Sequence, residues 1–156
     1  MNFLLFIAFL LPSYEKCPAL VSQTDQFDYE SVEDISISRD GVTGIDLHLL
    51  MSRKSIFMNF KVKGGGKCID DNEEMTVIFT DKSGLTMVND NNFNCDGVYT
   101  QHFLEDFGKK KELKKFLTKE IQTIKITTNE GPVQVNLSPT ERIRIYETLN
   151  CLMEKL

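Results

Sequence analysis

The sequence has few of the residues that nucleophilic or zinc chemistry needs. It contains two histidines, His48 and His102, and four cysteines that lack the paired spacing of a zinc site. It also lacks an excess of basic residues, because its formal net charge is −5, and this argues against a general nucleic-acid binder. These absences favour a binding function over catalysis, with a partner other than nucleic acid.

Long apolar runs are missing as well. The one apolar run, residues 2–11, is too short to cross a bilayer as a helix but suits the core of a secretory signal peptide. We therefore predict a signal peptide over residues 1–22, no transmembrane segment, and export to the periplasm or the extracellular space. The sequence leaves the cleavage site open between a cut after Ser22 and one nearer residues 12–14. Two features depart from this pattern: no basic residue precedes the run, and Glu15 and Lys16 stand where small residues are expected. The alternative is a cytoplasmic protein in which this segment is a buried N-terminal element.

The remaining chain has no linker, repeat or low-complexity segment, so residues 23–156 are predicted to form a single domain. Apolar residues alternate with polar ones, as in β-strands, over residues 32–38, 45–51, 56–63, 75–80, 85–88, 122–128 and 133–137. Helical spacing covers residues 109–119, and a capping box from Ser138 to Glu141 opens a second helix. The predicted fold class is α+β, with an antiparallel sheet of about seven strands packed by a short helix and a long C-terminal helix.

Residues 68–97 are predicted to form a β-hairpin around residues 81–84, a type I turn followed by Gly84 in the left-handed region. A hairpin centred between Lys82 and Ser83 brings Cys68 nearly opposite Cys95, at a separation that a disulfide can bridge. The asparagines and aspartates between them leave the register open. If the leader is removed after Ser22, Cys17 goes with it and three cysteines remain.

The second arm of this hairpin contains an asparagine-rich segment, residues 90–97. It matches the oxygen-ligand positions and the glycine that open an EF-hand loop, but Phe103 stands where that loop needs its bidentate acid. The other explanation is a polar loop whose residues supply turn geometry. We predict no cofactor, and as the alternative a looser calcium site, with Asp70 and Asp71 across the hairpin adding oxygens to the four ligands Asp90, Asn92, Asn94 and Asp96.

Two further patterns invite a functional interpretation. Gly64, Gly65 and Gly66 before Lys67 look like part of a phosphate loop, but the upstream glycine and the following serine or threonine are missing, so the run is better explained by a bulge or a close backbone approach. Residues 109–125 carry seven lysines against two glutamates, which is either a solvated helix face or a surface for an anionic partner. The residues predicted for that surface are Lys109, Lys110, Lys111, Lys114 and Lys115.

Catalysis by a nucleophile would have to use one of the two histidines. Cys95 with His102 is one conceivable pair, but a disulfide at Cys95 would prevent it. His48 lies on the polar face of a predicted strand with Asp46 on the same side, which could orient the imidazole. Surface or structural roles are the favoured interpretation of both histidines.

The segments 62–68, 78–81 and 93–97 (VKGGGKC, IFTD and FNCDG) make the chain look like small exported bacterial proteins of unknown function, over about residues 56–152. The resemblance favours export and a Cys68–Cys95 disulfide, and it implies no activity. We therefore expect an exported, non-enzymatic domain that binds a protein or an envelope surface. The alternatives are a calcium-dependent or hydrolytic enzyme that uses residues 90–96, and a carrier of a small apolar ligand.

Overall fold

The computed structural model describes residues 20–21, 30–32, 34–38, 43–52, 55–104 and 108–154. Ten strands in these ranges form two antiparallel sheets. A six-stranded sheet has the order β1-β2-β4-β5-β8, with β3 also paired to β4. Its strands are β1 (Leu20–Val21), β2 (Glu30–Val32), β3 (Ile35–Ser38), β4 (Gly44–Ser52), β5 (Ser55–Val62) and β8 (Val98–Leu104).

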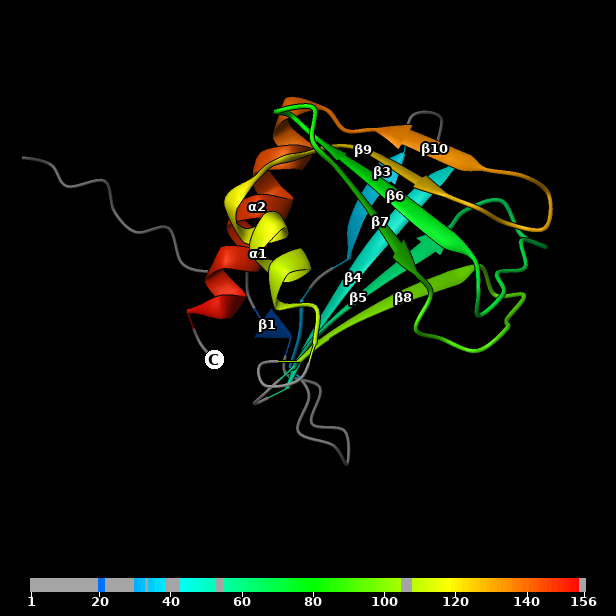
Figure 1. The fold of residues 1–156 in the computed structure, drawn as a ribbon, viewed down its shortest axis with the longest axis horizontal. Coiled ribbons are helices and arrows are strands. Elements are labelled where there is room, and N and C mark those ends of the chain that lie inside the picture. The colour runs from blue at the N-terminus through cyan, green and yellow to red at the C-terminus, as the bar shows by residue number, and fades with distance from the viewer. Residues whose placement is uncertain are drawn as a thin grey trace, which may run out of the picture.

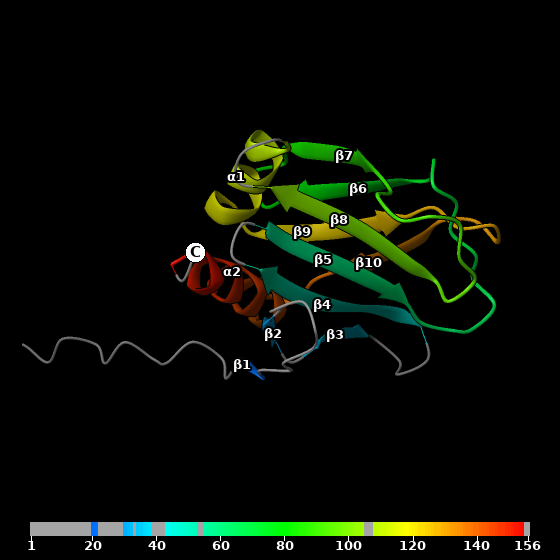
Figure 2. The ribbon, with the colours of Figure 1, turned by 90° about the horizontal axis from the view of Figure 1, so that it is seen from below.

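The second sheet has four strands in the order β10-β9-β6-β7, which are β10 (Val133–Asn136), β9 (Ile121–Ile126), β6 (Glu74–Phe79) and β7 (Gly84–Val88). The two sheets form facing layers (Figures 1 and 2). Their inward side chains make one hydrophobic core. The largest of the fully buried side chains are Tyr99, Phe60, Phe79, Phe103 and Phe116. Burial of this apolar surface is the main stabilising term of the sandwich.

Two helices lie together at one end of the sandwich, α1 (Lys110–Thr118) and α2 (Pro139–Met153) (Figures 1 and 2). Phe116 of α1 enters the core and meets Phe79 and Phe103 edge to face, with ring centroids 5.8 and 5.7 Å away. The predicted capping box of α2 is confirmed, because Ser138 Oγ accepts from Glu141 N at 3.3 Å and Ser138 N donates to the Glu141 carboxylate. No helix in the described ranges is long and apolar enough to cross a membrane.

The α+β class, the antiparallel pairing and both predicted helices are confirmed, but the strands divide between two sheets instead of forming one. Strand β8 was not predicted. Its inward positions are Tyr99, Gln101 and Phe103, all buried. Gln101 places a polar residue in the middle of the buried row, and this breaks the alternation by which a strand is recognised.

The predicted hairpin is confirmed with a corrected centre. Ile78 pairs with Gly84, so the turn is centred on Asp81, and Lys82 rather than Gly84 has the positive φ, 68°. Beyond the ladder, Ile69 pairs with Asn94. Cys68 and Cys95 therefore lie directly opposite each other, and they form a disulfide with a Cα–Cα distance of 3.8 Å.

The predicted leader over residues 1–22 falls mostly outside the described residues, as does Cys17. Its described part is β1, which pairs with β2 through Leu20 and Val32. Cys151 in α2 is disulfide-bonded as well.

Candidate functional site: the loop end of the sandwich

Three loops meet at the end of the sandwich opposite the helices. Residues 63–73 connect β5 to β6, residues 89–97 connect β7 to β8, and residues 127–132 connect β9 to β10. Figure 1 shows these connections on the right and both helices on the left. We call the three loops together the loop end. Binding residues are often carried on loops that a rigid scaffold positions, and this makes the loop end the candidate binding site.

The loops of this end are bonded to one another. The Cys68–Cys95 disulfide joins the first loop to the second, and next to it Ile69 and Asn94 exchange backbone hydrogen bonds of 2.8 and 3.0 Å. Cys68 N donates to Asn129 Oδ1 at 2.8 Å, and Asn129 N donates to Cys68 O at 3.0 Å, which joins the first loop to the third. The loop end is therefore a rigid surface.

A pocket of about 570 Å³ opens where the first two loops meet β4 and β5. The glycine run forms one wall. Gly64, Gly65 and Gly66 have φ angles of 107°, 61° and 66°, which side-chain-bearing residues rarely adopt. Within the described part of the chain, no hydrogen bond uses the backbone N–H groups of these three glycines. The pocket is lined by Asp46, Lys61, Val62, Lys63, Gly64, Gly65, Gly66, Lys67, Cys95 and Asp96.

The charges of this pocket are of both signs. Lys63 Nζ lies 3.0 Å from Asp46 Oδ1 and also donates to Ser36 Oγ at 2.5 Å. Lys67 forms an ion pair with Glu130 of the third loop. Among the described residues, Lys61 and Asp96 have no such partner. The pocket thus offers one unpaired ammonium group and one unpaired carboxylate beside backbone donors.

The asparagine-rich loop has a structural task that its sequence did not reveal. Strand β8 is an edge strand, and three of its backbone N–H groups point away from β5. Val98 N donates to Asn94 Oδ1 at 2.9 Å, Thr100 N to Asn89 Oδ1 at 2.9 Å, and His102 N to Asp90 Oδ2 at 2.8 Å. Side chains thus provide acceptors for the N–H groups at the open edge of β8, which would otherwise be free to pair with another strand.

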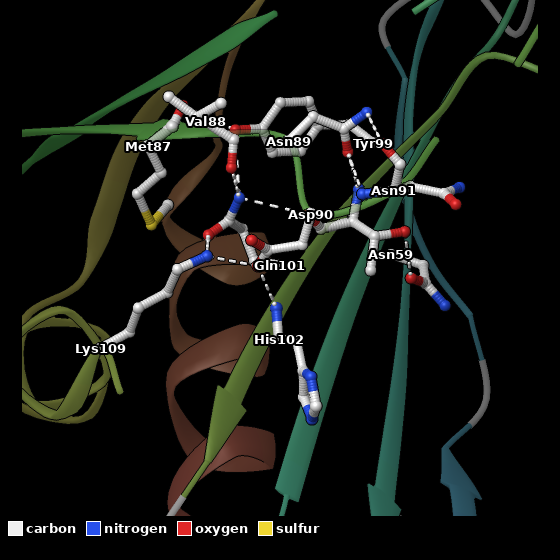
Figure 3. A network of polar contacts seen from close by, with 11 residues as sticks. Asn59, Met87, Val88, Asn89, Asp90, Asn91, Tyr99, Gln101, His102 and Lys109 are labelled. Carbon is white, nitrogen blue, oxygen red and sulfur yellow. Dashed lines mark hydrogen bonds and ion pairs between the residues drawn. The ribbon is translucent and has the colours of Figure 1, made fainter. Parts of the chain in front are cut away.

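The same loop is tied to the core through Gln101 (Figure 3). Gln101 is fully buried, and its amide donates to the carbonyl of Val88 and to Tyr99 Oη at 3.1 Å. Tyr99 Oη donates to Met87 O at 2.6 Å, and burial raises the pKa of this phenol. Lys109 Nζ donates to Gln101 Oε1 at 2.8 Å and forms an ion pair with Asp90. These bonds join β7, β8 and the start of α1.

This geometry bears on the four predicted calcium ligands. Asp90 accepts from His102 N and pairs with Lys109, and the Asn94 amide bonds the backbone of Val98 in both directions. Asn92 and Asp96 are exposed.

The two aspartates of the opposite arm interact with each other. Asp70 accepts from Asp71 N at 2.8 Å, and this neighbouring carboxyl raises the pKa of Asp71. No cluster of three or more acidic, histidine or cysteine side chains suited to a metal occurs in the described ranges. Turn and edge geometry explains the loop, and calcium binding stays a prediction.

Both histidines lie on the outer face of the six-stranded sheet. His48 Nδ1 bonds the carboxylate of Asp34, a partner that the sequence did not indicate, whereas the expected Asp46 pairs with Lys63. His102 stacks on Phe57, with ring centroids 4.0 Å apart, and burial lowers the pKa of its imidazole. Cys95 is in the disulfide and cannot serve His102 as a nucleophile. Among the described residues, no hydroxyl or thiol is hydrogen-bonded to either ring.

The lysine-rich segment is divided between bonded and solvent-exposed side chains. Lys109 is bonded to Asp90 and Gln101, and Lys115 donates to Gly84 O at 3.3 Å. Beyond the predicted set, Lys119 lies 2.6 Å from Asp81, and this ion pair holds the pKa of Asp81 well below its usual value. The exposed members are Lys110, Lys111, Lys114 and Lys125. An anionic partner for this face stays a prediction.

One apolar side chain stands out on the loop end. Phe93 is 62% exposed, the largest fraction among the exposed large hydrophobic residues of the described chain. It follows exposed Asn92 and precedes Asn94, whose backbone and side chain are both hydrogen-bonded. A large aromatic ring is therefore presented to solvent from a fixed stretch of backbone.

Comparison of the chain with protein-family models, curated proteins and solved structures finds no significant match. The resemblance to small exported bacterial proteins stays a prediction.

Proposed function

We propose that this chain is an exported, non-enzymatic domain that binds a partner protein through the loop end, with Phe93 as the apolar anchor. The observation that carries the proposal is the 62% exposure of Phe93 on a loop whose neighbouring residues are held by a disulfide and by backbone bonds. Aromatic residues are enriched in protein–protein interfaces, where a few of them supply most of the binding free energy.

The rigidity of the loop end supports this choice over other surfaces. Binding costs free energy when loops must become ordered, so a preformed surface binds more tightly than a mobile one of equal area. The three loops are joined by the Cys68–Cys95 disulfide, the Cys68–Asn129 hydrogen bonds and the Lys67–Glu130 ion pair. Burying a phenylalanine side chain contributes about 1.5 to 3 kcal/mol, and on this scaffold little of it is offset by loop ordering.

Export is supported by two independent features. Disulfides form and persist in oxidising compartments, and the described chain has the Cys68–Cys95 bond and a disulfide-bonded Cys151. The apolar run of residues 2–11 suits a secretory leader. A reducing cytoplasm, the alternative location, would not sustain these bonds.

The other functions considered have less support. An enzyme that used residues 90–96 would need carboxylate or amide groups free to act, and Asp90 and Asn94 are bonded to the edge of β8. A carrier of an apolar ligand would need space between the sheets, where buried aromatic side chains pack instead. The described pocket lies at the surface and is lined by charged residues and glycines.

A comparison of variants tests the proposal. The tagged full chain, its Phe93→Ala variant and an Ile143→Ala variant are each incubated with an extract of the source organism's envelope. Ile143 is the matched control, because it is also an exposed apolar residue, 46% accessible, but lies on α2. The protein retained by the unchanged chain is identified, purified and titrated against all three.

We expect Phe93→Ala to weaken binding of this protein about 30-fold, the effect of losing a typical interface anchor. Ile143→Ala should bind like the unchanged chain. Equal affinity for all three forms, or retention of no protein by the unchanged chain, would contradict the proposal.

A further inference from the structure

We infer that the glycine-walled pocket, which is lined in part by Cys95 and Asp96 of the loop that carries Phe93, is a carboxylate-binding site. The proposed function supplies the source of the carboxylate, an acidic group of the partner protein that enters the pocket when Phe93 is buried. The site itself follows from the donors and charges of the pocket.

The pocket wall supplies hydrogen-bond donors that have no partner within the described chain. Successive backbone N–H groups in turn conformations form anion-binding concavities, and a run of three glycines with positive φ lets an anion approach the backbone without meeting a Cβ atom. A Cβ added at Gly65 or Gly66 would meet no heavy atom within 4 Å, so the glycines serve backbone conformation and not packing. Their N–H groups have no acceptor among the described residues.

The charged side chains of the pocket leave one cation for a ligand. Lys61, Lys63 and Lys67 line the pocket, opposed by Asp46 and Asp96, and two of the lysines are already in ion pairs. Lys61 is the cation left for a ligand. Asp96 repels any anion that enters, but by Coulomb's law it repels a dianionic phosphate about twice as strongly as a singly charged carboxylate, and Lys61 alone balances only one negative charge. The lining thus favours a monoanion.

The walls of the pocket are rigid. The segments that form the walls hold one another, because Val62 N donates to Gly97 O at 2.8 Å and Lys63 N donates to Gly44 O at 2.9 Å. A Cβ at Gly97 would lie 3.2 Å from Val62 O, so the loop carrying Asp96 packs closely on β5. The Cys68–Cys95 disulfide fixes Cys95, which also lines the pocket. A preformed site loses little entropy when it binds.

The test is an NMR titration of the ¹⁵N-labelled, oxidised chain that uses no partner protein. Sodium acetate probes carboxylate binding, sodium phosphate probes a dianion, and sodium chloride controls for ionic strength. N-acetylglycine and the α-amide of N-acetylglutamate then separate a chain-terminal carboxylate from a side-chain one. The amide signals of Gly64, Gly65 and Gly66 report occupancy.

We expect acetate to shift these glycine signals with saturation, while chloride does not, and Lys61→Gln to weaken the acetate affinity about tenfold, the effect of losing one charge-assisted hydrogen bond. Lys125→Gln on β9 makes the same charge change at an exposed position outside the pocket and should leave the affinity unaltered. Tighter binding of phosphate than of acetate, unsaturable shifts, or equal effects of the two lysine variants would overturn the inference.

The outcome is separable from that of the proposed function. If acetate binds and Phe93→Ala leaves partner binding intact, the loop-end proposal fails while the carboxylate site stands. If Phe93→Ala weakens partner binding and acetate causes no saturable shift, the reverse holds.

Discussion

Asn89 shows how much a single polar residue contributes to this fold. Its side chain is buried, with 6% exposure, and its amide makes four hydrogen bonds, to Asp70 O, Asn91 O, Asn91 N and Thr100 N. Together with Gln101 it joins the two sheets at their β7–β8 edge (Figure 3). Buried polar groups of this kind stabilise a fold only when every donor and acceptor is satisfied.

We predict that Asn89→Ala lowers the free energy of unfolding by about 1 to 3 kcal/mol, because it removes the partners of Thr100 N–H and Asp70 C=O in partly buried hydrogen bonds. Asn92→Ala is the matched control, since Asn92 is exposed and its change should stay within about 0.5 kcal/mol. Urea denaturation of the oxidised proteins measures both. A small and equal effect of the two variants would show that Asn89 has no such role.

Lys82 adopts the left-handed conformation, with φ at 68°, in the turn between β6 and β7. This conformation costs a side-chain-bearing residue about 1 to 2 kcal/mol, part of which glycine would recover. We predict that Lys82→Gly raises the free energy of unfolding by about 0.5 to 1 kcal/mol. Lys82→Ala, which loses the 3.0 Å bond to Gln122 and keeps its Cβ, should give no gain. If the glycine variant melts below the alanine variant, the assignment of strain to Lys82 is wrong.

At the scale of elements, the sequence predicted correctly the strands in which apolar residues repeat at a single period and the helix that a local motif begins. The rows Ile56, Met58, Phe60 and Val62 of β5 and the capping box of α2 were both predicted and confirmed. The edge strand β8 was missed because Gln101 interrupts its buried row. The backbone N–H groups at its open edge bond to side chains of the preceding loop, and hydrophobic periodicity does not predict such bonds.

The candidate site was predictable only in part. The Cys68–Cys95 pair followed from hairpin geometry, and the turn-forming interpretation of residues 90–96 agrees with their hydrogen bonds. The pocket was not predicted, because it combines β4, β5 and two loops that are distant in sequence. The pairing of His48 with Asp34 was missed for the same reason, since it depends on how β3 lies beside β4.

The turn of Asp81 joins the β6–β7 hairpin to α1 through Lys119. The ion pair lowers the pKa of Asp81 in the folded chain below its usual value of 3.8, so the pair stabilises the fold above that pH and ceases to do so as the pH falls through the lowered pKa. We predict that Asp81→Asn lowers the urea midpoint at neutral pH and that the difference shrinks below about pH 4. Asparagine can still accept from Ser83 N, so the comparison isolates charge. An equal deficit at both pH values would exclude the ion pair as its cause.

For the whole molecule, the fold separates two ends with different character. The helices close one end, and the disulfide-joined loops form the other (Figure 1). The loop end also carries the pocket and the exposed Phe93. The open edge of β8 is covered by its own loop, which opposes non-specific strand pairing. Recognition by side chains of the loop end is the mode of binding that this architecture favours.

The mass of the mature protein from its source organism, measured before and after reduction, tests the leader and the disulfides together. A cut after Ser22 would remove β1 and Cys17, whereas a cut before Cys17 would keep both. Because β1 pairs with β2 and Cys151 is disulfide-bonded, we expect a leader shorter than residues 1–22, and we predict the longer product, with no free thiol. A mature chain that begins at Gln23, or a free thiol in the unreduced protein, would contradict this.

The most direct test of partner binding through the loop end is photo-cross-linking in the source organism. A photoreactive phenylalanine analogue is placed at position 93 in one strain and, as the control, at position 143 on α2 in another, since both positions are exposed and apolar in the unchanged chain. Irradiation should join one defined protein to the chain from position 93 and none from position 143. An adduct from position 143 alone, or the same adducts from both positions, would contradict the account.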